Sequence, residues 1–138
     1  MLIQPFTMAD YTEVYRLWDG LDGIGLSAAD EPERIAAYLE KNPGLSFICR
    51  VDSAVVGGVL CGHDGRRGYI HHLAVRKDMQ GRGIGRRLLD ECITGLKKEG
   101  IDKAHVLVFK ENTEGHRFWE KVDWYLRDDL VIFSTDIG

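Results

Sequence analysis

The stretch QGRGIG, residues 80–85, places three glycines in six positions between an apolar run and an amphipathic one. The run before it is YIHHLAV (69–75) and the run after it is GRRLLDECITGLKK (85–98). The first has the composition of a buried strand, and the second spaces its apolar residues as a helix does. A glycine loop at a helix N-terminus offers backbone N–H groups to an anion, which the helix dipole also favours. The sequence therefore predicts a loop that binds a diphosphate.

Two common nucleotide-binding motifs do not fit this loop. A dinucleotide fingerprint needs Gly or Ala at the third marked position of GxGxxG. Counting from Gly81 that position is Arg86, and counting from Gly83 it is Leu88. A Walker loop needs GxxxxGK followed by Ser or Thr, and the chain has no such run. Both nucleotide-binding interpretations are therefore rejected.

Positive charge is concentrated around the glycine loop, although the net charge of the chain is −4. Residues 66–98 hold nine of the 18 Lys and Arg residues and only three acidic ones. Exposed helix faces commonly carry Lys and Arg, and this explains about half of these charges. The patch is short, has few interleaved aromatic residues and belongs to an acidic protein, which argues against nucleic acid as a partner. A small polyanion fits it better.

The length and the cysteines indicate the class of protein. A chain of 138 residues is about the size of one domain, so we expect a single domain over 1–138. The opening residues show no basic segment followed by an apolar one, and no apolar run reaches the length of a membrane span. We expect a cytoplasmic protein with no membrane partner. Cys49, Cys61 and Cys92 lack CxxC spacing, so we interpret them as reduced core residues, and we expect no metal.

The order of expected elements predicts a mixed sheet. Thr7 and Asp10 have the spacing of a capping box, and the helix that follows carries Val14, Leu17, Trp18 and Leu21 on one face. The other expected helices cover 31–41, the run that ends at Gly100, and a segment that Asn112 caps. The expected strands are 46–51, 55–64, 69–75, 104–109 and 130–135. The first three of these form an antiparallel meander, and strand, helix and strand across 69–109 form a right-handed parallel crossover.

Three segments together resemble one protein family. LAVRKDMQGRGIGRRLL (73–89) resembles the central motif of the GNAT superfamily of acetyl-CoA-dependent acyltransferases, whose pattern Gln80, Gly83 and Gly85 fill. IQPFTMADYTEVYRLW (3–18) resembles the family's first strand and helix, and NTEGHRFWEKVDW (112–124) resembles its late segment. The resemblance implies an α/β (α+β) fold. Its central sheet would be mixed and mostly antiparallel, with about six to seven strands, a parallel crossover at the centre and about four helices.

The same resemblance implies acetyl-CoA as the cosubstrate. Its pyrophosphate would bind the loop formed by Gln80, Gly81, Arg82, Gly83, Ile84 and Gly85. Its pantetheine would run along Leu73, Ala74 and Val75, and Asn112 matches the Asn that contacts this arm in many members. Arg82, Arg86 and Arg87 would meet the ribose phosphate.

Acetyl transfer to an amine also needs a base and a donor to the carbonyl oxygen. The backbone N–H near Leu73 or Ala74 is the expected donor. Many relatives carry an acidic residue two positions before this Leu, where this chain has His71, and a histidine can accept a proton at neutral pH. His72 is the alternative base, because adjacent strand residues face opposite sides and only one of the two can face the acceptor. A purely structural role remains open for both.

The late segment departs from the family pattern at two positions. Trp119 stands where the family usually has the Tyr that protonates the leaving thiolate, and an indole N–H is no useful acid. We expect Trp119 to form a wall near the thioester sulfur or to pack with Phe118 and Val122, while Tyr125 or water meets the thiolate. Asp123 replaces the usual Gly.

Two functions therefore remain open on the sequence. The leading hypothesis is an N-acetyltransferase in which an amine of a small molecule, a peptide or a protein N-terminus attacks acetyl-CoA directly in a ternary complex. The alternative is a noncatalytic acyl-CoA-binding sensor or regulatory module, which the missing Tyr makes credible. The loop 19–30 carries Asp19, Asp22 and Asp30 and would suit a cationic amine. An exposed last strand would allow a homodimer.

Overall fold

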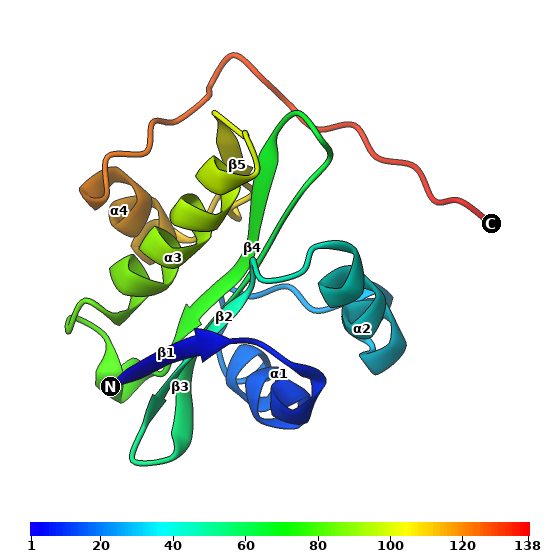
Figure 1. Ribbon diagram of the computed structural model, residues 1–138. Coiled ribbons are helices and arrows are strands. Elements are labelled where there is room, and N and C mark those ends of the chain that lie inside the picture. Colours follow the sequence, from blue (N-terminus) through cyan, green and yellow to red (C-terminus); the bar gives the residue numbers. More distant parts are fainter. The chain divides into compact units, whose positions relative to one another are not determined.

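The computed structural model describes residues 1–138 and divides into two compact units, Met1–Leu107 and Val108–Gly138. The first unit holds a five-stranded sheet with helices on both of its faces (Figure 1). The second unit holds one helix and an irregular C-terminal segment.

The sheet has the strand order β1-β2-β3-β4-β5. Its strands are β1 (Leu2–Pro5), β2 (Phe47–Val51), β3 (Ala54–His63), β4 (Gly68–Val75) and β5 (Ala104–Val106). The first four strands pair antiparallel in turn, and β4 then pairs with β5 in parallel. The predicted meander and the predicted parallel crossover are therefore confirmed.

Four α-helices accompany the sheet and agree with the sequence expectations. They are α1 (Tyr11–Asp19), α2 (Pro32–Lys41), α3 (Ile84–Lys98) and α4 (Thr113–Lys121). Short 3₁₀ turns precede three of them: η1 (Met8–Asp10), η2 (Ala28–Asp30) and η3 (Lys77–Met79). The predicted capping box of Thr7 and Asp10 is present at η1. None of the helices combines the length and the apolar character that a membrane crossing requires.

Two neighbouring glycines of β3 show that α1 and α3 cover opposite faces of the sheet. A Cβ atom on Gly57 would lie 3.0 Å from Leu88 and 3.1 Å from Ile84, both on α3. A Cβ atom on Gly58 would instead meet Val14 of α1 at 3.5 Å. Figure 1 shows the same arrangement, with α1 and α2 on one side of the strands and α3 on the other. Because adjacent strand residues point to opposite faces, each face of β3 supports its own core.

Each face of the sheet has the apolar core that the sequence predicted. The stripe of α3 is buried and consists of Ile84, Leu88, Cys92 and Leu96. On the other face α1 buries Val14, Leu17 and Trp18. The three cysteines are buried and unpaired, as expected for reduced core residues. Burial of this apolar area is the main favourable contribution to folding of the first unit.

The structure corrects two expectations about strands. The sheet has five strands, fewer than the six to seven expected, and β5 ends at Val106 although the apolar run continues to Phe109. Residues 130–135 form no strand, and Leu130, Val131, Ile132 and Phe133 are between 57% and 93% exposed. An apolar, β-branched composition describes a segment that fits a pleated, half-buried surface, but it supplies no partner strand by itself.

Candidate active site

The glycine loop leaves β4 and enters α3 with two residues in the left-handed region. Gly81 has φ of +79° and Gly83 has φ of +81°, a conformation in which a side chain would be strained. A Cβ atom on either residue would meet nothing within 4 Å, so the space beside the loop is open. The Gln80 side chain donates from Nε2 to the Val75 carbonyl at 2.9 Å and ties the loop to the end of β4.

Backbone N–H groups gather along this loop without partners. The N–H of Arg87 is the first in α3 to donate to a backbone carbonyl, that of Gly83, at 3.1 Å. The N–H groups of residues 81–86 ahead of it have no acceptor in the protein. Such groups at a helix N-terminus form an anion site, because they carry the positive end of the helix dipole.

Charged side chains reinforce this site. Arg82, Arg86 and Arg87 are exposed and form no ion pair within the chain. Arg76 differs, because its Nε donates to Asp78 at 2.6 Å and its charge is matched locally. The residues present therefore fit a diphosphate on the loop with a further phosphate near the three free guanidinium groups.

Strand β4 departs from regular pairing on each of its two edges. Its contact with β5 covers only Gly68–Ile70, so residues 71–75 have no neighbouring strand on that side. Toward β3, Gly58 pairs with Ala74 and Leu60 pairs with His71, so that two residues of β4 face the single residue Val59. These two residues, His72 and Leu73, form a β-bulge, and His72 has φ of +52°.

The bulge corrects the premise that His71 and His72 must face opposite sides of the strand. His71 and His72 both line one cavity of about 470 Å³, whose other walls come from Leu60 of β3, from α2 and from the segment between α1 and α2. Strict alternation of side chains holds for a regular strand, but the extra residue of a bulge breaks the alternation at that point.

His71 lies on the cavity wall between two tyrosines. Its ring stacks on Tyr69 with centroids 6.4 Å apart and meets the edge of Tyr38 at 6.1 Å. Burial, followed by the nearby His72, lowers the pKa of His71 below its usual range. Its imidazole is therefore neutral at pH 7 and able to accept a proton. The Tyr38 hydroxyl is buried without a hydrogen-bond partner, and burial raises its pKa.

The partner of His72 is Asp30, for which the sequence indicated only a place among the acidic residues of the loop 19–30. Nε2 of His72 lies 2.8 Å from Oδ1 of Asp30, whose side chain is buried. Asp30 closes a second capping box with Ser27, accepting the Ser27 N–H at 3.0 Å. The spacing Ser-x-x-Asp in residues 27–30 is the signal that could have placed this carboxylate in a defined turn.

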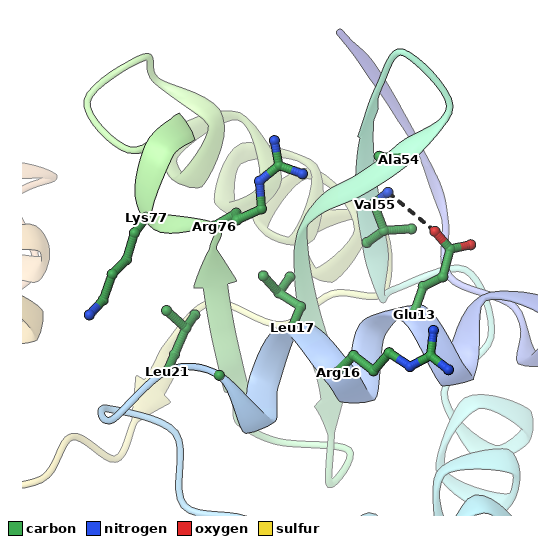
Figure 2. Close-up of a pocket in the computed structure, with 9 residues that line it drawn as sticks. Glu13, Arg16, Leu17, Leu21, Ala54, Val55, Arg76 and Lys77 are labelled. Atoms are coloured by element: carbon green, nitrogen blue, oxygen red, sulfur yellow. Dashed lines mark hydrogen bonds between the residues drawn. The ribbon is translucent and has the colours of Figure 1, made fainter.

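A second hollow lies against α1, the start of β3 and the segment after β4 (Figure 2). Its volume is also about 470 Å³, and Arg16, Arg76 and Lys77 contribute positive charge to its walls. Its only carboxylate, Glu13, contacts Arg50 and accepts the Val55 N–H, each at 3.4 Å. None of the predicted site residues lines this hollow, and it offers no free proton acceptor.

The remaining predicted site residues belong to the second unit. Asn112 caps α4 as expected, and its Oδ1 accepts the Gly115 N–H at 3.0 Å. Trp119 packs on Phe118 and Trp124, with ring centroids at 5.1 Å and 4.5 Å. Tyr125 is exposed.

Asp123 occupies the position where the family usually has Gly, and its φ of +69° gives the physical reason for that preference. Asp is among the residues that tolerate this region better than most. No group of three or more His, Cys, Asp and Glu side chains is placed to hold a metal ion.

Comparisons with known proteins agree with this geometry. The model of the Acetyltransferase (GNAT) family matches residues 11–124. Acetyltransferase YE1169 of Yersinia enterocolitica is 32% identical over 133 residues, which cover 96% of this chain and 93% of the relative. The chain belongs to the GNAT family of acetyltransferases. It is an acetyl-CoA-dependent acyltransferase.

Solved structures show the same fold at lower identity. An aminoglycoside 6'-N-acetyltransferase of Acinetobacter haemolyticus superposes with a TM-score of 0.82 at 15% identity, covering 100% of both chains. The PaiA N-acetyltransferase of Thermoplasma acidophilum, solved with coenzyme A, gives a TM-score of 0.76 at 17% identity and covers 92% of this chain and 91% of its own.

Proposed function

We propose that this enzyme transfers an acetyl group from acetyl-CoA to an amine by direct attack while both substrates are bound. One observation carries the proposal: the part of β4 that lacks a neighbour on its β5 side leads from two cavity-lining histidines directly into a loop with free N–H groups. A base for the amine and an anchor for a diphosphate thus lie on one continuous segment.

We propose that the cosubstrate lies along this segment. The N–H groups of residues 81–86 would hold the diphosphate, and Arg82, Arg86 and Arg87 would meet the ribose phosphate. The free edge of β4 at Leu73, Ala74 and Val75 would carry the pantetheine. The PaiA N-acetyltransferase was solved with coenzyme A, which supports coenzyme A as the kind of ligand. Acetyl-CoA supplies the thioester carbonyl that the amine attacks.

The proton is taken by His71 in this proposal. An attacking amine must lose a proton, and the lowered pKa of His71 keeps its imidazole neutral and ready to accept it. The backbone N–H near Leu73 or Ala74 would stabilise the negative charge that develops on the carbonyl oxygen. The thiolate can leave without full protonation, because a thiol has a pKa near about 8.5.

The charges of the cavity indicate which acceptors it favours. Arg34 and Lys41 lie seven positions apart on α2, line the cavity and form no ion pair. The only carboxylate on the wall, Asp30, is already paired with His72, and Asp19 and Asp22 do not line the cavity. We therefore propose an amine that carries an anionic group, in place of the cationic amine that the acidic loop suggested.

The function itself is tested by two measurements. The first is release of coenzyme A thiol that depends on an added amine, and the second is the mass of the acetylated product. The assay uses a panel of amines, amino acids, polyamines and peptides. Product formation supports the enzyme, whereas tight binding of acetyl-CoA with no acetylated product across the panel supports the alternative binding module.

The glycine loop can be tested by coenzyme A affinity. A substitution at Gly83 would strain a left-handed residue in addition to filling the loop, so its effect on affinity would have two causes. Gly85 has an ordinary helical backbone inside α3 and avoids this strain. We expect Gly85→Val to weaken coenzyme A binding about tenfold or more, because a branched side chain would stand where the diphosphate approaches. Calorimetry gives the affinity, and Gly20→Val at the end of α1 is the control. Unchanged affinity in folded Gly85→Val would contradict the loop assignment.

The base can be tested by a pH profile. We expect kcat/KM to fall on the acid side with an apparent pKa below about 6.5, the ordinary value for histidine, because burial lowers the pKa of His71. His71→Ala should lose this limb and lower kcat by roughly 10² to 10⁴. His63→Ala, outside the cavity, should keep both. Full turnover with an unchanged profile in His71→Ala would remove His71 as the base.

The acceptor class can be tested with two peptides that differ only in Asp or Asn at the second residue. We expect the Asp peptide to have the higher kcat/KM, by about fivefold at low salt, with a smaller ratio at high salt. Arg34→Gln combined with Lys41→Gln should abolish the difference, while Arg66→Gln should leave it. Equal use of both peptides by the natural protein would contradict the proposal.

We also propose a homodimer in which a second copy covers residues 130–133, the exposed apolar segment. Sedimentation equilibrium should then detect a dimer that Ile132→Asp weakens, and a monomer throughout the micromolar range would contradict it. The unpaired cysteines fit the reducing conditions of the cytoplasm, where we place the enzyme.

A further inference from the structure

We infer that Asp30 and Trp18 are positioning residues, which hold His72 in its left-handed conformation and thereby maintain the bulge that arranges the reacting groups. This inference rests on the proposed function and deepens it. In this proposal the bulge orients the backbone N–H of Leu73 and places His71 on the cavity wall.

The backbone at His72 needs such support. The other residues besides glycine with positive φ are Asp52, Ser53 and Asp123, which lie in turns outside the strands, whereas His72 lies within β4. For residues other than glycine this region is sparsely populated and persists only where surrounding contacts determine it. Contacts that hold His72 must therefore exist on the protein side.

Two hydrogen bonds hold His72, one through its side chain and one through its carbonyl oxygen. The imidazole Nε2 lies 2.8 Å from Oδ1 of Asp30, and the carbonyl oxygen accepts the indole N–H of Trp18 at 3.0 Å. The Trp18 ring also meets the imidazole edge to face, with centroids 4.9 Å apart. The imidazole and the carbonyl of His72 are thus both anchored, while the preceding residue, His71, is paired with Leu60 in the sheet. With the groups on both sides of the N–Cα bond of His72 held in place, rotation about that bond, which φ describes, is restricted.

Both anchors are themselves rigid. Trp18 is fully buried in the core beneath α1, and Asp30 is 5% exposed. The second carboxylate oxygen of Asp30 accepts the Ser27 N–H at 3.0 Å, and its carbonyl accepts the Tyr11 hydroxyl at 2.7 Å. A rigid carboxylate can therefore hold the imidazole against the preference of the backbone.

The contact with Asp30 also removes one ring nitrogen of His72 as a proton acceptor. A carboxylate only accepts hydrogen bonds, so the Nε2 atom of His72 carries the proton in this pair. That nitrogen is committed to Asp30, whereas the His71 ring has no hydrogen-bond partner in the protein. In this proposal His71 accepts the proton, and His72 acts by maintaining the backbone conformation of the bulge.

Two substitutions at His72 separate a backbone role from an imidazole role. Both His72→Gly and His72→Ala remove the ring and leave Asp30 without its partner, but only glycine adopts positive φ freely. His72→Asn serves as a reference, because Asn tolerates positive φ better than most residues. We expect the kcat of His72→Gly to lie within about threefold of that of His72→Asn. The kcat of His72→Ala should be about tenfold lower than that of His72→Gly, with the KM for acetyl-CoA unchanged. The Tm of His72→Gly should equal or exceed that of His72→Ala, the reverse of the usual order in a strand.

Asp10 offers a matched control for Asp30. It too is 5% exposed, accepts the N–H of its capping residue Thr7 at 3.0 Å, and pairs through its other oxygen, with Arg50 at 2.7 Å. We expect Asp30→Ala to lower kcat about tenfold or more, and Asp10→Ala to lower the Tm comparably while kcat stays within about twofold. In the His72→Gly background, Asp30→Ala should reduce kcat no further.

The outcomes are distinct. Equal loss of kcat in His72→Gly and His72→Ala, with loss of the acid limb of the pH profile, would make His72 the base and overturn the inference. A lower Tm with the kcat of the natural protein in all His72 and Asp30 variants would mean that the His72–Asp30 contact contributes only to stability. That result would also overturn the inference. If the natural protein acetylates no amine while the Tm order holds, the proposed function fails and the backbone role of the pair stands.

Discussion

The site depends on one backbone constraint, the left-handed residue in the middle of β4. A regular strand would send His71 and His72 to opposite faces and would keep its N–H groups in the ladder with β3. The bulge at His72 removes both restrictions at the same point. The end of β5 after Val106 frees the other edge of β4. The same few residues thus gain an open edge, two ring side chains on one wall, and a direct path into the glycine loop.

Charge follows the same division along the segment. The loop after β4 collects N–H groups and unpaired guanidinium groups, which suit a polyanion. The cavity before it contains one carboxylate that is already paired and two free cations on α2. Neither region has a free carboxylate that would repel a negatively charged ligand. These charges agree with the proposal of anionic groups on both substrates, and the lowered pKa of His71 agrees with its proposed role as proton acceptor.

Much of the fold was predictable because periodicity reports burial. The stripe from Ile84 to Leu96 and the face of Val14 and Trp18 repeat at helical spacing, and both proved to be core. The glycine loop was predictable because Gly81 and Gly83 need backbone angles that other residues avoid. The segment 130–135 was not, since strand composition cannot provide the neighbour that a strand requires.

The active-site details were harder to predict for a different reason. The alternation rule fails at a bulge, and His72 carries no glycine signal that would announce positive φ. The role of Asp30 depends on a contact across 42 positions of sequence, which no local pattern encodes. Such a pairing arises only when the turn before α2 packs beside β4, so the structure was needed to find it.

The central claim is that residues 71–86 form one continuous site for the cosubstrate and the chemistry. Titration of coenzyme A into ¹⁵N-labelled protein, followed by backbone amide NMR shifts, tests this most directly. We expect the largest shifts at the amides of residues 81–86, with further shifts at Leu73 and Ala74. Unchanged signals there, with the largest shifts instead around Glu13 and Lys77 in the second hollow, would contradict it.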